Sequence, residues 1–260
     1  MLTNCNDYKN DVYSCGGEDG IIKFLLKQIN QTGFVIEFGA ADGFHCSNTA
    51  RLWKDQRSHE ALLIESNPSH YEKLEAAVGS NPNVTTDQAL VVNIDDHTTR
   101  VADVCSIDVD GEDYQIAQRM NVPHQIVIIE HNPTVPPHVE MIGIEGTQYG
   151  SSALSITNMM TGKGYTLVAV TKTNLVFLYG DHRDRFESRL EVLFDYSSLN
   201  YVVTSYDGLY DMIGEFGYGF QQPANLRLHG MGDEKRMTID AVTREYMRRM
   251  LALEDAKGNS

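Results

Sequence analysis

The sequence has few cysteines, and their spacing does not indicate a site. Cys5, Cys15, Cys46 and Cys105 are scattered, and no C-x-x-C motif occurs. This pattern argues against a structural zinc site and indicates no disulfide framework, so we expect free thiols. Cys46 lies beside a glycine-containing loop, where we expect a small packing residue rather than a reactive thiol.

Long apolar runs and clusters of basic residues are also missing. Residues 1–31 contain no basic segment followed by an apolar core, and no stretch approaches the roughly twenty apolar residues of a membrane span. We therefore expect a soluble cytoplasmic protein without a membrane partner. The 21 Lys and Arg stand against 36 Asp and Glu, a formal charge of −15. This charge disfavours nucleic acid, which clustered cations bind, and favours a neutral or cationic small molecule.

What the chain does contain is an alternation of strand and helix patterns. Its 260 residues, 42% of them hydrophobic, can form one large core. We expect strands at 34–38, 61–64, 84–92, 105–110, 125–130, 165–170 and 174–179. We expect helices at 68–78, 114–120 and 152–161, and one that Ser47 or Asn48 caps and that runs through Trp53. Alternation of this kind predicts an α/β fold with a mostly parallel seven-stranded sheet. Only residues 171–173 separate the last two strands, so these should form an antiparallel hairpin.

The loop after the first predicted strand indicates a nucleotide site. An apolar strand leads into Glu37-x-Gly39-x-x-x-Gly43, with Asp42 before the second glycine. This differs from the dinucleotide fingerprint G-x-G-x-x-G, and its acidic residues would repel a pyrophosphate. Carboxylates at this position suit a ligand with cationic groups, and S-adenosylmethionine carries both an ammonium and a sulfonium.

The second predicted strand ends at Glu65, at the spacing where an acidic side chain binds ribose hydroxyls. Either acidic signal alone would be explained by helix capping, whereas together they favour a nucleoside site. The residues expected to contact the cofactor are Glu37, Gly39, Ala40, Asp42, Gly43, Glu65, Gln88 and Asp108.

A second group of polar residues follows the fourth and fifth predicted strands. Asp108 and Asp110 project to one side if the chain is extended there, and Glu130 and Asn132 repeat the arrangement. Oxygen ligands from two strand ends suit Mg²⁺, so these four residues are candidate metal ligands. The metal-free alternative is that they bind substrate hydroxyls and the methionine end of the cofactor. For catalysis we consider Asp110, with His131 and His45 as candidate bases.

The last eighty residues do not continue the alternation. We divide the chain into a domain at 1–180 and an extension at 181–260, with helical patterns at 186–194 and 239–253. The second pattern carries an apolar stripe, which should pack on the core or form a homodimer contact.

Several of these motifs, taken in order, resemble the FkbM-like S-adenosylmethionine-dependent methyltransferases. The residues that carry the resemblance are Glu18-Asp19-Gly20, Glu37-Phe-Gly39-Ala-Ala-Asp42-Gly43, Ser47-Asn48-Thr49, Ile64-Glu65, Ser106-Ile-Asp108-Val-Asp110-Gly111-x-Asp113-Tyr114, Ile129-Glu130-x-Asn132-Pro133, Gly150-Ser-Ser-Ala-Leu154 and Lys163-Gly164-Tyr165. The resemblance covers roughly residues 18–180. It implies a Rossmann-like class I methyltransferase fold with an antiparallel last strand, and O-methylation of sugars, glycans or natural products. The acidic strand ends also resemble the metal site of magnesium-dependent O-methyltransferases, although that site typically reads Asp-Asn where this chain has Glu130-His131-Asn132.

The sequence therefore predicts methyl transfer from S-adenosylmethionine to a hydroxyl of a small polar acceptor. Two alternatives remain open. One is a non-catalytic nucleoside-binding or scaffold protein with the same fold. The other is a metal-dependent hydrolase or hydroxylase that uses the acidic residues.

Overall fold

The computed structural model describes residues 1–55, 58–148, 150–195, 201–204 and 210–213. The main sheet contains β1 (Phe34–Phe38), β2 (Glu60–Ile64), β3 (Val84–Asp87), β4 (Val104–Ile107), β5 (Ile126–Glu130), β6 (Tyr165–Val170) and β7 (Asn174–Tyr179). The helices are α1 (Glu18–Leu25), α2 (Pro68–Val78), α3 (Asp113–Arg119), α4 (Ala153–Gly162) and α5 (Leu190–Leu193), with short turns η1 (Cys5–Tyr8), η2 (Arg51–Asp55) and η3 (Ile94–Asp96). A separate hairpin pairs β8 (Tyr201–Thr204) with β9 (Tyr210–Ile213).

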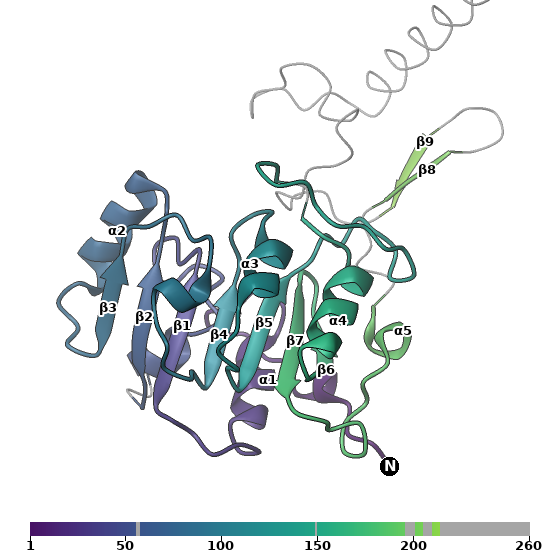
Figure 1. The fold of residues 1–260 in the computed structure, drawn as a ribbon, viewed down its shortest axis with the longest axis horizontal. Coiled ribbons are helices and arrows are strands. Elements are labelled where there is room, and N and C mark those ends of the chain that lie inside the picture. The colour runs from purple at the N-terminus through teal and green to yellow at the C-terminus, as the bar shows by residue number, and fades with distance from the viewer. Residues whose placement is uncertain (56–57, 149, 196–200, 205–209, 214–260) are drawn as a thin grey trace, which may run out of the picture.

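The strands of the main sheet follow the order β3-β2-β1-β4-β5-β7-β6 (Figure 1). The first five strands in this order are parallel, and β7 lies antiparallel between β5 and β6. The predicted α/β class, the mostly parallel sheet and the final antiparallel hairpin are therefore confirmed. Because β1 to β5 are parallel, their carboxyl ends share one edge of the sheet, where ligands of such folds bind.

Alternating side chains of the buried strands feed two cores, one on each face of the sheet. Phe34, Ile36 and Phe38 pack with residues of α3, α4 and α5. Val35 packs on the opposite face with residues of α1, α2 and η2. Burial on both faces explains why these strands read as near-continuous apolar runs.

Two predicted strands end earlier than expected. The third stops at Asp87 rather than residue 92, and beyond it Leu90 and Val92 are exposed. The fourth stops at Ile107, because Asp110 adopts a left-handed conformation with φ 59°. Aspartate tolerates this conformation better than most residues, and the turn ends the extended chain before α3 begins.

Helical predictions near the ends of the sheet were also too long. The helix expected through Trp53 is only the π-turn η2. Within 186–194 only α5 is helical, because Glu187 donates a backbone hydrogen bond to Thr3 and Arg189 is extended. Phe186 and Leu193 are nevertheless buried in the two cores. The predicted helix at 239–253 lies outside the described residues, as does any dimer contact it would make.

The expectation that all cysteines are free thiols was wrong. Cys15 and Cys46 form a disulfide across 31 residues, whereas Cys5 and Cys105 are free and buried. No local spacing signals this pair, because the fold brings together the segment before α1 and the loop after β1. Among the helices of the described ranges, none combines the length and the apolar character that a membrane span requires.

Candidate functional site

The loop after β1 runs close against the end of β4. Gly39 has φ 78°, and a Cβ there would lie 1.6 Å from the backbone oxygen of Asp108. Its backbone N–H and that of Ala40 donate to the carbonyl of Ile64, which extends the contact with β2. The close approach of two chain segments therefore requires a glycine at position 39, which was predicted to contact the cofactor. This approach brings the ends of β1, β2 and β4 together.

Two predicted cofactor residues shape the same loop. Oδ1 of Asp42 accepts hydrogen bonds from the backbone N–H of Phe44 and His45, at 2.9 and 2.8 Å. The N–H of His45 is the main cause that lowers the pKa of Asp42. Gly43 follows with φ 84°, which a residue with a side chain adopts at a cost. Asp42 is thus an ionised, partly exposed carboxylate on a fixed turn.

Glu65 connects the loop after β1 to the start of α2. Its Oε2 accepts from the backbone N–H of Ala41 at 2.8 Å, and its Oε1 accepts from that of Asn67 at 2.7 Å. The side chain is only 6% exposed, so these bonds hold the carboxylate in one orientation. Each oxygen keeps a second lone pair, which is what a ribose hydroxyl would need.

Glu37 and Gln88 differ in their surroundings from the other predicted cofactor residues. The buried carboxylate of Glu37 accepts from the hydroxyls of Ser47 and Thr49, both at 2.6 Å, and from the backbone N–H of Asn48 at 2.8 Å. Burial raises the pKa of Glu37 in spite of these donors. Glu37 therefore anchors the far end of the loop, whereas Gln88 is exposed just beyond β3.

Asp108, Asp113 and Glu130 form a carboxylate trio at the ends of β4 and β5. One oxygen of each lies within 4.8 Å of the others. Burial, followed by repulsion from neighbouring carboxylates, raises the pKa values of Asp108 and Glu130 well above normal. Burial also raises the pKa of Asp113 to about 6. Because the carboxylates of Asp108 and Glu130 lie so close together, repulsion favours a proton on at least one of them unless a cation lies between them.

The trio shares Asp108 and Glu130 with the predicted ligand set, but it contains Asp113 and neither Asp110 nor Asn132. Asp110 is exposed on its left-handed turn and lies outside the trio. Asp113 takes its place, held by the backbone N–H of Val109 at 2.8 Å and of Gly111 at 3.0 Å. Oδ1 of Asn132 accepts from the N–H and hydroxyl of Thr134, which turns the chain after β5. Sequence reasoning missed Asp113 because it assumed an extended chain through Asp110.

The two candidate bases lie in different places. His131 is 1% exposed, its ring lies 5.8 Å from that of Phe194, and burial lowers its pKa to about 4. It is therefore neutral at pH 7. His45 is exposed, with Nε2 3.7 Å from Sγ of Cys46. A catalytic role for either remains a prediction.

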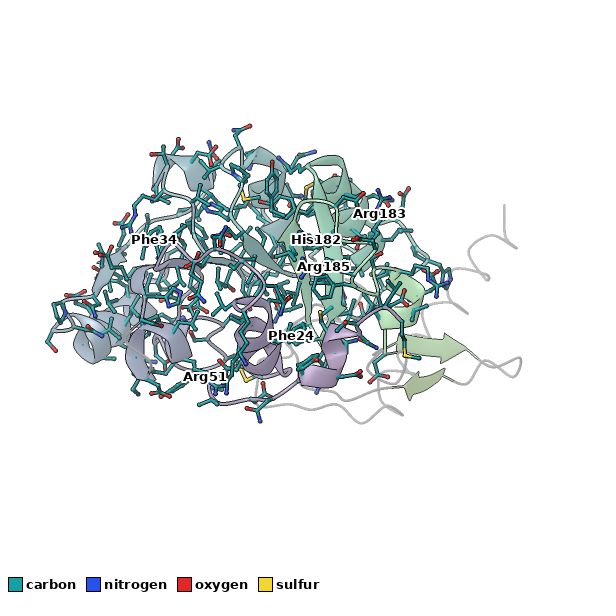
Figure 2. The ribbon with its side chains drawn as sticks, turned by 90° about the horizontal axis from the view of Figure 1, so that it is seen from below. Phe24, Phe34, Arg51, His182, Arg183 and Arg185 are labelled. Carbon is teal, nitrogen blue, oxygen red and sulfur yellow. A yellow bond between two sulfur atoms is a disulfide. The ribbon has the colours of Figure 1, made fainter. Side chains whose placement is uncertain are left out.

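A cavity of about 300 Å³ lies at the other edge of the sheet, near the start of β6. Its lining includes Tyr165, Asp181 and Arg183, and the last two form an exposed ion pair at 2.6 Å. Figure 2 views the molecule from below, with His182, Arg183 and Arg185 together on the segment after β7. Since β7 is antiparallel, this edge is opposite the carboxyl ends of β1 to β5, and the cavity is separate from the acidic site.

Comparison with known proteins gives fold-level similarity. No family model and no curated protein matches the chain. A similar solved structure is the CMeT domain of the citrinin polyketide synthase, 12% identical with TM-score 0.45, covering 63% of this chain and 51% of that one. A TehB-like S-adenosylmethionine-dependent methyltransferase from Corynebacterium glutamicum is 9% identical with TM-score 0.40, covering 66% and 90%. Magnesium protoporphyrin IX methyltransferase from Synechocystis, with bound S-adenosylhomocysteine, is 12% identical with TM-score 0.43, covering 63% and 81%.

Proposed function

We propose that the protein is an S-adenosylmethionine-dependent methyltransferase. The observation that carries the proposal is Glu65, a buried carboxylate fixed at the end of β2 by the loop after β1, with free lone pairs. Its place next to that loop suits the ribose of a nucleoside, and the ionised Asp42 suits the cationic end of the ligand. The parallel sheet with its antiparallel β7 is the plan expected for such an enzyme.

The acceptor in this proposal is a hydroxyl of a small polar molecule such as a sugar or a natural product. The bound cofactor supplies a methyl group already activated on sulfur. The protein then has to place the acceptor oxygen in line with that methyl group and accept the hydroxyl proton. Asp113, whose pKa burial raises to about 6, is a suitable proton acceptor near neutral pH.

The donor set of the trio also fits a divalent cation. Hard oxygen ligands within 4.8 Å of one another are what Mg²⁺ binds, and a cation would relieve their mutual repulsion. Asp108, Asp113 and Glu130 would hold it, in place of the predicted set with Asp110 and Asn132. Such an ion would supply positive charge that stabilises a developing alkoxide.

Calorimetry with S-adenosylmethionine tests the cofactor assignment. We expect binding by the wild-type protein and about tenfold or more weaker binding by Glu65→Gln, because a charge-assisted hydrogen bond is lost. Glu72→Gln, on the exposed side of α2, is the matched control and should bind normally. Absence of binding by the wild-type protein would reject the proposal. If Glu65→Gln bound as tightly as Glu72→Gln and the wild-type protein, the ribose contact would be rejected.

Turnover to S-adenosylhomocysteine on a panel of hydroxylated acceptors tests the acidic site. Asp113→Asn should lose most of the activity, whereas Asp110→Asn should retain it, because only Asp113 belongs to the trio. The reverse result would restore the assignment made from the sequence. If a metal ion takes part, a chelator should abolish turnover and added Mg²⁺ should restore it. Binding without turnover would favour the non-catalytic alternative.

A further inference from the structure

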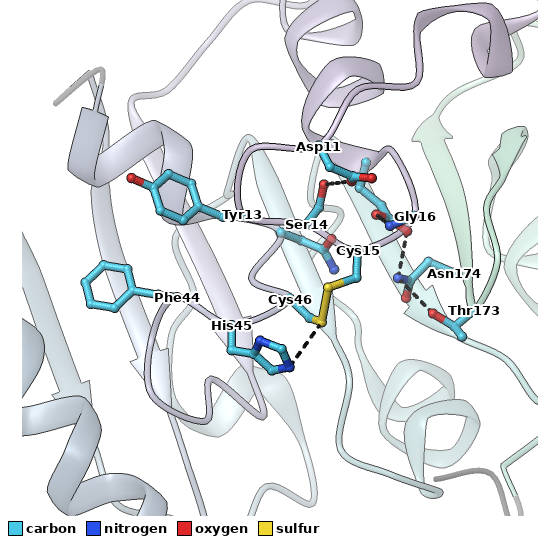
Figure 3. The surroundings of a disulfide bond; sticks show 12 residues. Asp11, Tyr13, Ser14, Cys15, Gly16, Phe44, His45, Cys46, Thr173 and Asn174 are labelled. Atoms are coloured by element: carbon cyan, nitrogen blue, oxygen red, sulfur yellow. Dashed lines mark hydrogen bonds between the residues drawn. A yellow bond between two sulfur atoms is a disulfide. The ribbon is translucent and has the colours of Figure 1, made fainter. Parts of the chain in front are cut away.

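An exposed disulfide joins the segment before α1 to the loop after β1 (Figure 3). Cys15 is exposed and Cys46 is partly buried, with their Cα atoms 5.0 Å apart. We propose that this disulfide is a thiol-exchange site, and that its reduction loosens the loop after β1 and weakens cofactor binding. The inference rests on the methyltransferase function proposed above.

The Cys15 side of the crosslink is a firm anchor. The carboxylate of Asp19 accepts from the successive backbone N–H groups of Val12, Tyr13 and Ser14, at 2.8, 2.7 and 3.0 Å. The buried Glu18 then ties this segment to the sheet. It accepts from the backbone N–H of Gly16 at 2.9 Å and from Nδ2 of Asn174, the first residue of β7, at 3.0 Å. These bonds do not depend on the disulfide.

The loop that carries Cys46 is held at both ends and at Phe44, whose ring lies 5.6 Å from that of Trp53 and 3.9 Å from Nζ of Lys54. Glu65 fixes the start of the loop at Ala41, and Glu37 fixes the residues from Ser47 onward. Between them, Asp42 accepts from two N–H groups within the loop itself. Cys46 has φ 55°, a left-handed conformation that non-glycine residues seldom adopt without a constraint. The crosslink supplies that constraint, so its loss should relax the backbone at Cys46 and His45, and the N–H of His45 is one of the two that orient Asp42.

The surroundings of the two sulfurs suit exchange with a dithiol. A thiolate of the dithiol attacks Sγ of Cys15, the more exposed of the two residues, forms a mixed disulfide and expels Cys46 as a thiolate. The second thiol of the reagent then attacks the reagent sulfur of the mixed disulfide. This releases the Cys15 thiol, and the reagent leaves as a cyclic disulfide. Two electrons and two protons pass from the dithiol to the protein. Nε2 of His45 lies 3.7 Å from Sγ of Cys46 and can stabilise the leaving thiolate, which speeds the first step.

The remaining thiols do not interfere with a test. Cys5 and Cys105 are fully buried, and burial raises the pKa of Cys5 to about 12 and that of Cys105 further. Alkylation of the folded protein after reduction should therefore modify Cys15 and Cys46 alone. Mass spectrometry of the trapped protein then measures how much disulfide has been reduced.

The experiment is calorimetry of S-adenosylhomocysteine binding to the full chain before and after treatment with dithiothreitol. We expect the Kd to rise about tenfold on reduction, within the usual range of coupling between sites, while circular dichroism stays unchanged. The double variant Cys15→Ser, Cys46→Ser should bind like the reduced protein and should not respond to dithiothreitol.

The possible outcomes separate the two proposals. Equal affinity in the oxidised and reduced states, or unfolding on reduction, would overturn the exchange-site inference and leave the methyltransferase proposal intact. Absence of binding in both states would overturn the proposed function itself. The variant His45→Ala should be reduced several-fold more slowly than wild type, with the exposed His70→Ala as control. An unchanged rate would remove His45 from the exchange step.

Discussion

Asp110 and Asp113 are three residues apart, yet only Asp113 belongs to the carboxylate trio. In an extended chain Asp108 and Asp110 would face the same way, and that rule led to the prediction of Asp110. The left-handed backbone at Asp110 breaks the alternation, and the carboxylate of Asp113 returns to the end of β4 by accepting from Val109 and Gly111. A single backbone conformation thus decides which side chain meets Glu130.

His124 is another residue whose chemistry depends on its surroundings. It is 0% exposed, and its Nδ1 accepts the backbone N–H of Ala102 at 3.0 Å. Burial lowers its pKa from 6.5 to about 4, so the folded protein holds this imidazole neutral. The unfolded chain therefore binds more protons at His124 between pH 4 and 6.5, and folding should be weakened as pH falls through that window.

We expect His124 to contribute about 3 kcal/mol to the loss of stability between pH 7 and pH 4. The variant His124→Asn, whose side-chain oxygen can replace Nδ1, should have a flatter pH dependence in urea unfolding. His70→Asn, at an exposed site, should follow the wild-type curve. A difference between His124→Asn and wild type that does not change with pH would contradict the prediction.

At the scale of elements, the site depends on how closely the ends of three strands approach one another. Gly39 allows the loop after β1 to pass the end of β4, and the same residue continues the hydrogen bonding of β1 to β2. The periodicity of the sequence predicts each strand separately, whereas their spacing at the edge is set by this backbone contact.

The variant Gly39→Ala should therefore lose about 3 kcal/mol or more of stability, because the new Cβ meets a backbone oxygen and the positive φ is strained. Gly162→Ala is a matched control, since a Cβ there meets nothing within 4 Å at the end of α4. It should be neutral or stabilising by about 0.5–1 kcal/mol. Equal midpoints for the two variants in chemical denaturation would contradict the proposed close approach.

At the scale of the whole molecule, the disulfide limits the unfolded chain as well as the folded one. It closes a loop with a sequence separation of 31 residues. In the chain-entropy view this is worth about 3 to 4 kcal/mol, less than the total stability of an ordinary domain. Dithiothreitol should therefore lower the urea midpoint of the wild type without abolishing folding. A midpoint that does not respond would show that the disulfide is absent in solution.

Across the whole molecule, the sequence predicts the features that leave a local pattern and misses those that depend on contacts between distant segments. Local sequence patterns predicted the bounds of β1, β6 and β7 and of α2. A strand buried on both faces gives a run of apolar residues, and a helix buried on one face gives apolar residues at helical spacing. Strand-end rules placed Asp108 and Glu130 at one edge. The pairing of Cys15 with Cys46 left no such pattern, since it depends on the folding of segments distant in sequence. The same holds for the exchange of Asp110 for Asp113, which a turn conformation decided.

The placement of β7 between β5 and β6 has a consequence for synthesis on the ribosome. Translation delivers Tyr165–Val170 before Asn174–Tyr179, yet the earlier strand reaches the sheet only through the later one. Until the later strand has left the exit tunnel, β5 is an edge strand whose unpaired N–H and C=O groups can pair with any extended peptide nearby. The nascent chain is then most exposed to wrong pairing, and a pause in translation before residues 174–179 have left the tunnel should favour aggregation.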